Sequence, residues 1–189
     1  MNPYRAVIAG LWLAWALYWW AAARDIKPLV RRETPLSRLL HVVPLCVAVV
    51  LFWLPPLSLP GVGPARLEDS ATRYWIGVAL TAAGLLFAVW ARVHIGRNWS
   101  GTVTLKEEHE LITSGPYRFA RHPIYTGMLL ALCGTALARG DWQGALAVLI
   151  VFLALWRKLR LEERWMREQF GARYEQYSAR VKRLVPFLW

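Results

Sequence analysis

Charge is scarce in this chain of 189 residues, because charged residues make up 19% of it and hydrophobic residues make up 57%. An average globular protein has about 25% charged and about 45–50% apolar residues. Disordered chains need low hydrophobicity and coiled coils need a high content of charge, so both classes are excluded. The composition instead predicts a membrane protein.

Cysteine is also scarce, with only Cys46 and Cys133 in the chain. Both lie inside apolar runs, so a disulfide scaffold and a zinc ribbon are excluded, and we expect each cysteine to be a small buried residue. The four histidines show neither an HxxxH nor an HxxEH spacing. The sequence therefore predicts no metal site.

Long apolar runs fill most of the sequence. A helix of about 17 to 25 apolar residues crosses a bilayer, and two shorter runs can form a hairpin, so we predict about five transmembrane helices. The runs cover residues 6–23, 39–54, 74–91, 124–138 and 142–156. Arg139, Gly140 and Asp141 separate the last two runs, which indicates a helical hairpin.

The predicted fold class is therefore all-α, a polytopic membrane protein whose hairpin is followed by a helical C-terminal region. The chain has no internal repeat and no low-complexity linker, so we expect one domain over residues 1–189. Residues 1–58 are predicted to be a two-helix N-terminal addition, and residues 74–189 are predicted to form the core.

The cations are distributed unevenly between the connecting segments. The net charge is +11, and 19 of the 23 Lys and Arg residues lie in residues 24–38, in residues 92–121 and from residue 157 onward. The positive-inside rule puts these segments in the cytoplasm and the N-terminus outside. Orientation and anionic lipids explain the excess charge, so we expect no nucleic-acid partner. We expect a prokaryotic inner membrane protein.

The first polar stretch, residues 109–127, has an unusual layout for a connector. Gly115 and Pro116 predict a turn, and Pro123 suits the first position of the next helix. A residue before proline is held in an extended conformation, so His122 should project at the mouth of that helix. The same residue types also serve as interfacial anchors, and residue chemistry leaves both interpretations open.

The second polar stretch, residues 156–177, continues the last predicted span. Lys158 and Glu162 are four residues apart and share a helix face. They form either a solvated ion pair or a site in which Glu162 binds a cationic group. Gly171 is predicted to end this helix, and a short amphipathic helix should follow.

The sequence GPYRFARHPIYTG, followed after a hydrophobic hairpin by LEERWMREQFGARYEQYSARVKRLVP, resembles the isoprenylcysteine carboxyl methyltransferases. These are integral membrane enzymes related to phospholipid methyltransferases. The resemblance covers roughly residues 96–186 and implies S-adenosylmethionine as the cofactor, bound on the cytoplasmic side. It implies these cofactor-binding residues: His109, Glu110, Leu111, Ile112, Tyr117, His122, Pro123, Ile124, Tyr125 and Glu162.

The resemblance also implies an acceptor that is lipophilic, either a small molecule or a prenylated chain. Carboxyl methyltransferases of the family have an arginine four residues before the glutamate, where this chain has Lys158. A lysine offers a point charge instead of a planar fork. We expect Lys158, Arg157 and His122 to be the catalytic residues, with a cation holding the acceptor carboxylate.

Three other functions stay open at this point. A phospholipid N-methyltransferase would need a base such as His122 or Glu162, because an amine must lose a proton before it attacks. A membrane sterol-type reductase would bind a dinucleotide, and a non-enzymatic membrane protein would bind neither cofactor. The sequence leaves open whether the protein is a monomer or a homo-oligomer.

Overall fold

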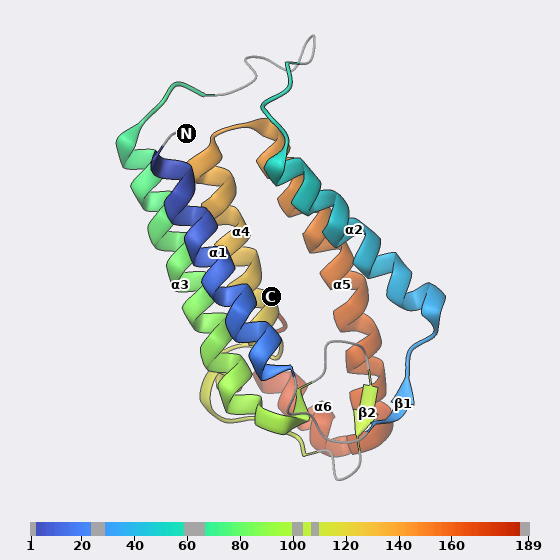
Figure 1. Ribbon diagram of the computed structural model, residues 1–189. Coiled ribbons are helices and arrows are strands. Elements are labelled where there is room, and N and C mark those ends of the chain that lie inside the picture. The colour runs from blue at the N-terminus through green and yellow to red at the C-terminus, as the bar shows by residue number, and fades with distance from the viewer. Residues whose placement is uncertain (1–2, 24–28, 59–66, 100–103, 107–109, 186–189) are drawn as a thin grey trace.

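Five long helices form a bundle that runs the length of the molecule (Figure 1). The computed structural model describes residues 3–23, 29–58, 67–99, 104–106 and 110–185. Its α-helices are α1 (Pro3–Ala22), α2 (Pro35–Trp53), α3 (Ala71–Ile95), α4 (Pro123–Arg139), α5 (Trp142–Phe170) and α6 (Ala172–Arg180). The five predicted apolar helices are therefore present, and α5 continues well past its apolar half.

Two short strands accompany the predicted helical fold. Strand β1 (Leu29–Arg32) pairs in antiparallel register with β2 (Thr104–Lys106). Two short 3₁₀ helices, η1 (Gly96–Asn98) and η2 (Gly115–Arg118), complete the described elements. The strands pair the segment before α2 with the segment after α3. The hydrophobic pattern of the sequence does not predict this contact.

Local signals explain where the helices begin and end. Asp141 caps α5 by accepting a hydrogen bond of 2.9 Å from the Gly144 backbone N–H. The preceding Gly140 has φ +66°, a left-handed conformation that glycine adopts without strain, so the predicted hairpin turn is confirmed. Gly171 ends α5 as predicted, and Pro123 occupies the first turn of α4. His122 lies just outside α4 with φ −122° and ψ 61°, short of the fully extended ψ expected before proline.

Small residues let α3 and α4 pack almost backbone to backbone. A Cβ added to Gly134 would lie 2.5 Å from the Thr81 backbone nitrogen, and one added to Gly84 would lie 2.5 Å from the Gly127 carbonyl oxygen. Within this seam the Thr81 hydroxyl lies 3.2 Å from the Thr135 hydroxyl, which accepts a hydrogen bond of 3.0 Å from Trp12 of α1. Close approach and interhelical hydrogen bonds are how helices associate in lipid.

The outer surface of the bundle is apolar. Trp53, Leu86 and Leu36 are 78%, 70% and 67% exposed, which suits a surface that faces hydrocarbon and not water. Among the described residues, two helices could cross a membrane by length and composition, namely Pro35–Trp53 and Ala71–Asn98, and α1 contributes the shorter apolar segment Ala6–Ala22.

The prediction that the cysteines are buried was wrong. Cys46 and Cys133 are both free thiols exposed on the outside of the bundle. In a bilayer an apolar side chain is stable on the outer face as well as inside, so an apolar environment in sequence does not imply burial.

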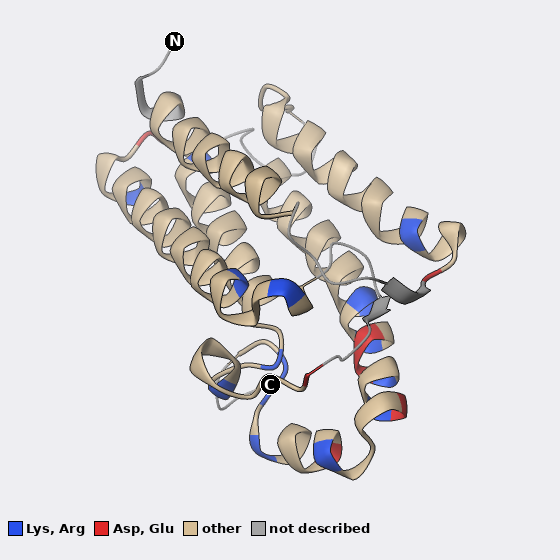
Figure 2. Ribbon diagram, turned by 60° about the horizontal axis from the view of Figure 1, so that its bottom comes forward, with Lys and Arg blue, Asp and Glu red and all other residues tan. Residues whose placement is uncertain are grey.

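The charged side chains gather at one end of the bundle. Figure 2 shows most Lys, Arg, Asp and Glu residues around the second half of α5, α6 and the segment that follows. The opposite end carries few charges, among them Arg73, Arg139 and Asp141. The bundle therefore has one polar end, and the two motif stretches of the sequence meet there.

We expect Gly134→Ala to destabilise the bundle, because its Cβ would meet the backbone of α3 at 2.5 Å. Overpacking of this kind costs about 1–3 kcal/mol. The measurement is the thermal unfolding midpoint of the detergent-purified protein. Gly10→Ala on α1, which has no atom within 4 Å of the added Cβ, is the control and should not lower the midpoint. Equal midpoints for the two variants would contradict the close packing.

Candidate active site

A buried carboxylate, Glu163 of α5, joins three segments of the chain at the polar end. Its side chain is 1% exposed. One carboxylate oxygen lies 2.7 Å from Arg121 Nη2, and the other accepts a hydrogen bond of 3.1 Å from Arg183 Nε. Arg167, one turn along α5, lies 3.5 Å away. The charge of Glu163 is therefore paired on both oxygens.

The chain after α6 is held against the start of α4. We call residues 182–184 the strap. The backbone N–H groups of Arg121 and His122 donate to the carbonyls of Lys182 and Arg183 at 2.8 and 3.0 Å. The Thr126 hydroxyl donates to the Leu184 carbonyl at 2.6 Å. The strap thus satisfies the backbone groups that lead into α4.

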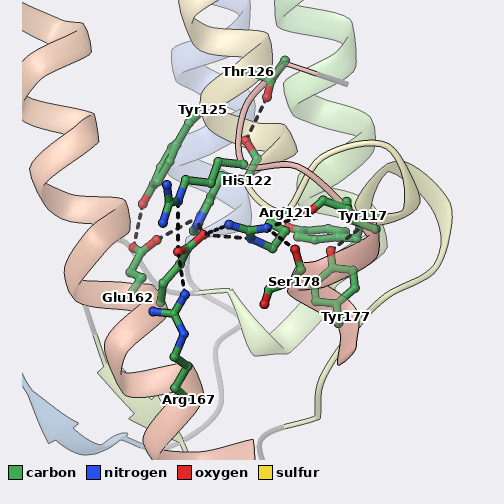
Figure 3. Close-up of polar contacts among 12 residues, drawn as sticks. Tyr117, Arg121, His122, Tyr125, Thr126, Glu162, Arg167, Tyr177 and Ser178 are labelled. Atoms are coloured by element: carbon green, nitrogen blue, oxygen red, sulfur yellow. Dashed lines mark hydrogen bonds and ion pairs between the residues drawn. The ribbon is translucent and has the colours of Figure 1, made fainter. Parts of the chain in front are cut away.

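Helix α6 is fixed to the same place by two further contacts. Arg121 Nη1 donates to the Ser178 carbonyl at 2.9 Å, and the Tyr177 hydroxyl donates to the Tyr117 carbonyl at 2.6 Å (Figure 3). Arg121 therefore links α5, α6 and the strap, which leaves it no freedom to contact a ligand.

His122 lies between two glutamates. Its ring stacks on Tyr125 with the centroids 5.5 Å apart and the planes 4° apart. Nδ1 lies 3.5 Å from Glu162, and Nε2 lies 3.4 Å from Glu163. Figure 3 shows His122 and Tyr125 above Glu162. The histidine therefore connects the structural Glu163 to the more accessible Glu162.

Glu162 is the accessible carboxylate of this pair, with a side chain that is 23% exposed. It accepts a hydrogen bond of 2.6 Å from the Tyr125 hydroxyl, and Lys158 Nζ lies 4.0 Å away. The same ammonium lies 5.6 Å from the centre of the Tyr125 ring. We call His122, Tyr125, Lys158 and Glu162 the polar cluster.

Paired charges shift the titration of these groups. Burial alone would lower the pKa of His122, but the two neighbouring carboxylates outweigh burial and raise its pKa above the ordinary value. Burial alone would raise the pKa of Glu162, but His122 and Lys158 lower it. Burial likewise opposes ionisation of Glu163, yet His122 and Arg121 hold its pKa at about 2. Near neutral pH both glutamates are therefore ionised.

An apolar aromatic cluster borders the polar one. Its buried residues are Ala91, Tyr117 and Ile124. Packed against them are Trp19, Ile95, Trp99, Ile112, Tyr125 and Met128. Tyr125 belongs to both clusters, so a ligand at Glu162 would lie next to aromatic and aliphatic side chains.

The structure brings most of the predicted site residues together. Ile112, Tyr117, Ile124 and Tyr125 meet in the apolar cluster. His122, Tyr125, Lys158 and Glu162 meet in the polar cluster, and buried Pro123 begins the helix that carries Tyr125.

Other predicted residues lie apart from these clusters. Arg157 points to α2, where Nη1 donates to the Ser37 carbonyl at 3.2 Å. Glu110 is exposed and Leu111 is half-buried, and the described contacts put neither residue in either cluster. His109 lies outside the described residues.

Sequence reasoning missed Glu163, Arg121 and Arg183 as parts of the site. Two adjacent glutamates in a strongly basic stretch were a usable signal, because neighbouring residues of a helix point in different directions. The sequence did not indicate that Arg121 and Arg183, 42 and 20 residues from Glu163, would meet it.

With this geometry established, comparison with known proteins identifies the family. The profile of the family described as phospholipid methyltransferase matches residues 72–173, more than half of the chain. The chain belongs to this family.

Several of its relatives are named as protein-S-isoprenylcysteine O-methyltransferases. A probable protein-S-isoprenylcysteine O-methyltransferase of Oryza sativa subsp. indica is 31% identical over 134 residues, which cover 66% of this chain and 69% of the relative. The protein-S-isoprenylcysteine O-methyltransferase of Schizosaccharomyces pombe is 32% identical over 104 residues, which cover 52% of this chain and 43% of the relative. The predicted resemblance is therefore confirmed, and the protein is a methyltransferase enzyme.

The fold agrees with a solved relative. The structure of the eukaryotic intramembrane Ras methyltransferase, isoprenylcysteine carboxyl methyltransferase, matches 84% of this chain with a TM-score of 0.56 and 20% sequence identity. The match covers 55% of that longer chain. The likeness shows a shared, predominantly helical fold.

We expect Glu163→Gln to unfold at a lower temperature than the wild type, because it leaves two arginines without their buried counter-charge. Breaking a buried pair costs about 3–5 kcal/mol. The wild-type carboxylate, with its pKa lowered from 4.5 to about 2, stabilises the fold above pH 4.5 and loses this effect as the pH falls towards 2.

The variant should therefore lose less stability than the wild type between these pH values. Thermal unfolding in detergent over this range is the measurement. Glu175→Gln, at an exposed position of α6, is the matched control and should follow the wild type. An unchanged midpoint for Glu163→Gln at neutral pH would contradict the structural role.

Proposed function

We propose that the protein transfers a methyl group from S-adenosylmethionine to the carboxylate of a lipophilic acceptor in the membrane, forming a methyl ester. The proposal follows the isoprenylcysteine O-methyltransferase names of its relatives. The observation that carries it is the polar cluster, which lies where the apolar half of α5 gives way to the charged half. A water-soluble donor and a lipid acceptor can both reach this border.

The residues of the site suit this cofactor. S-adenosylmethionine has a cationic sulfonium and ammonium, an adenine ring and a carboxylate. The accessible carboxylate of Glu162 suits a cation, and the ring faces of Tyr125 and His122 favour one as well. The apolar cluster with Ile112, Tyr117 and Ile124 suits the adenine ring.

We assign cofactor binding to these residues together with Pro123, and to the preceding segment with His109, Glu110 and Leu111. When bound, S-adenosylmethionine supplies an electrophilic methyl group on sulfur.

The chain contributes binding and orientation to the reaction. A carboxylate is ionised near neutral pH and needs no general base. Holding two reactants in line is worth up to about 7–11 kcal/mol. Lys158, which is buried except for a small fraction of its side chain, holds the acceptor carboxylate through its ammonium group. His122 fixes Glu162 and the plane of Tyr125, so both side chains meet their ligands in one orientation.

Arg157 acts on the site from outside it. Its guanidinium donates to the backbone carbonyl of Ser37 and lies 3.3 Å from the Ser37 hydroxyl. Since Arg157 directly precedes Lys158, these contacts to α2 set the rotation of α5 at the site. We therefore assign Arg157 a positioning role, in place of the direct contact with the acceptor that the sequence predicted.

The arrangement in the membrane is part of the proposal. We propose five spans, α1 to the apolar half of α5, with the N-terminus outside and the polar end in the cytoplasm of a prokaryote. The gathering of charge at one end of the bundle supports this orientation (Figure 2). Residues 1–58 would be an addition to the core of residues 74–189. The acceptor would enter sideways between helices and leave its hydrocarbon in lipid.

The test of the reaction is methyl transfer from labelled S-adenosylmethionine by the purified protein, with a prenylated cysteine derivative as acceptor. We expect label in the organic phase that mild base releases as methanol, as an ester requires. Label that resists base would instead indicate an amine acceptor, such as phosphatidylethanolamine. Failure to bind S-adenosylmethionine at all would overturn the proposal.

Two substitutions should separate the two halves of the site. Glu162→Gln should raise the KM for S-adenosylmethionine about tenfold or more, because a hydrogen bond to a charged group is worth about 1.5–3 kcal/mol. Lys158→Met should raise the KM for the acceptor by a similar factor and leave cofactor binding almost unchanged. Steady-state kinetics with each substrate varied is the measurement. The exposed Glu175→Gln is the control, and equal effects of both variants on both substrates would refute the division.

A further inference from the structure

A cavity of about 670 Å³ lies between α1, α2, α3 and α4. Aromatic rings line much of it, including Trp12, Trp15, Phe52, Trp53 and Tyr74. The volume is typical of a ligand pocket, which has about 300–1,000 Å³ and a mostly apolar lining with a few polar groups. Apolar cavities do not hold water well, so hydrocarbon is the natural content.

This cavity is separate from the polar cluster. It is lined by the second half of α4 and by Asp141 after it, whereas His122 directly precedes α4. A helix rises about 1.5 Å per residue, and α4 has 17 residues. The length of α4, roughly 25 Å, therefore separates the end of the cavity at Asp141 from the methyl-transfer site, and about half of that length separates Leu132 from it.

The cavity is continuous with the outer surface of the bundle. Leu13 and Trp53 both line it, and they are 61% and 78% exposed. A chain from the surrounding bilayer can therefore enter it from the side, and it needs no opening to water.

Charged side chains of both signs line one end of the cavity. Arg139 lies 2.6 Å from Asp141, so these two charges cancel, and Asp69 also has an interaction partner. Arg73 donates to the Glu68 carbonyl at 2.6 Å, but among the described residues it has no carboxylate partner. Its Nε is buried without a hydrogen bond, and the guanidinium lies against Gly140, where a Cβ would clash at 2.7 Å.

Arg73 is half-buried, and an anion with oxygen acceptors would satisfy both its buried Nε and its charge. The apolar lining of the cavity suits a hydrocarbon chain next to Arg73. We propose that this cavity binds one membrane phospholipid, with the phosphate on Arg73 and an acyl chain along Trp12 and Trp15. The leaflet at this end of the bundle supplies that molecule directly. The methyl acceptor is a poorer occupant, because its reactive end must reach Lys158 at the other end of α4.

The test is native mass spectrometry of the protein after reconstitution into vesicles of phosphatidylglycerol and phosphatidylethanolamine and gentle extraction into detergent. We expect one bound phospholipid per wild-type chain. Arg73→Gln should reduce the bound fraction about tenfold, since it removes a charge-assisted hydrogen bond. Arg38→Gln, an equal change of charge at an exposed position of α2, should retain the lipid.

A second pair of variants tests the proposed acyl-chain site without changing the charge of the protein. Ala16 lines the cavity, whereas Ala14, two residues away on α1, does not. Ala16→Phe should displace the acyl chain, and Ala14→Phe should leave it bound. Helical circular dichroism and elution volume check that each variant is folded.

Three results would overturn the proposal. The first is a wild-type protein that carries no phospholipid, and the second is a bound mass that belongs to a fatty acid. The third is equal retention of phospholipid by Arg73→Gln, Ala16→Phe and their controls, which would indicate annular lipid only. The readout uses no methyl donor, so its outcome is independent of the proposed methyl transfer.

Discussion

Burial of the Glu163 carboxylate is the constraint on which the polar end of the molecule depends. An ionised group can leave water only when its charge and its lone pairs are matched. Here the match comes from Arg121 before α4, Arg183 after α6 and His122 between the two glutamates. Three segments that are distant in sequence must therefore meet at one point of α5, and the accessible cluster forms beside that point.

The two adjacent glutamates of α5, Glu162 and Glu163, have different roles. Successive residues of a helix point about 100° apart, so Glu163 faces the interior while Glu162 faces the border with the aromatic cluster. One carboxylate is 1% exposed and the other 23% exposed. His122 contacts both, so the geometry of the accessible carboxylate is set by the buried one. The pairing explains how a ligand site of few residues can be held firmly at the edge of a membrane.

The sequence predicts the helices of this protein well, because apolar runs, Pro123, Gly140 and Gly171 mark their extents. Arg139 and Asp141 also mark the hairpin turn. The sequence was a weaker guide to which side chains of these helices are buried inside the bundle. Each apolar helix is hydrophobic on every side, so no periodic pattern tells a lipid-facing Cys46 or Cys133 from an inward-facing residue.

Contacts between distant segments were the least predictable part of the fold. The packing of the helices determines which of their ends lie close together. Both the pairing of β1 with β2 and the contact of Glu163 with Arg183 depend on that packing. The motifs identified Tyr125, His122 and Glu162 as a group because their order along the chain resembles that of a family. The positions of Arg157 against α2 and of Arg121 in the strap contacts depend on tertiary packing alone.

The strap has a consequence for the order of folding. Its bonds join residues about 60 positions apart, from Arg121 to Lys182 and from Thr126 to Leu184. The helices close over much shorter distances along the chain, so they should form before the strap docks. Segments near a chain end that dock last are expected to open at a lower free energy than the core of the fold. Local opening there would separate Arg183 from Glu163 and loosen His122 while the helical bundle stays folded.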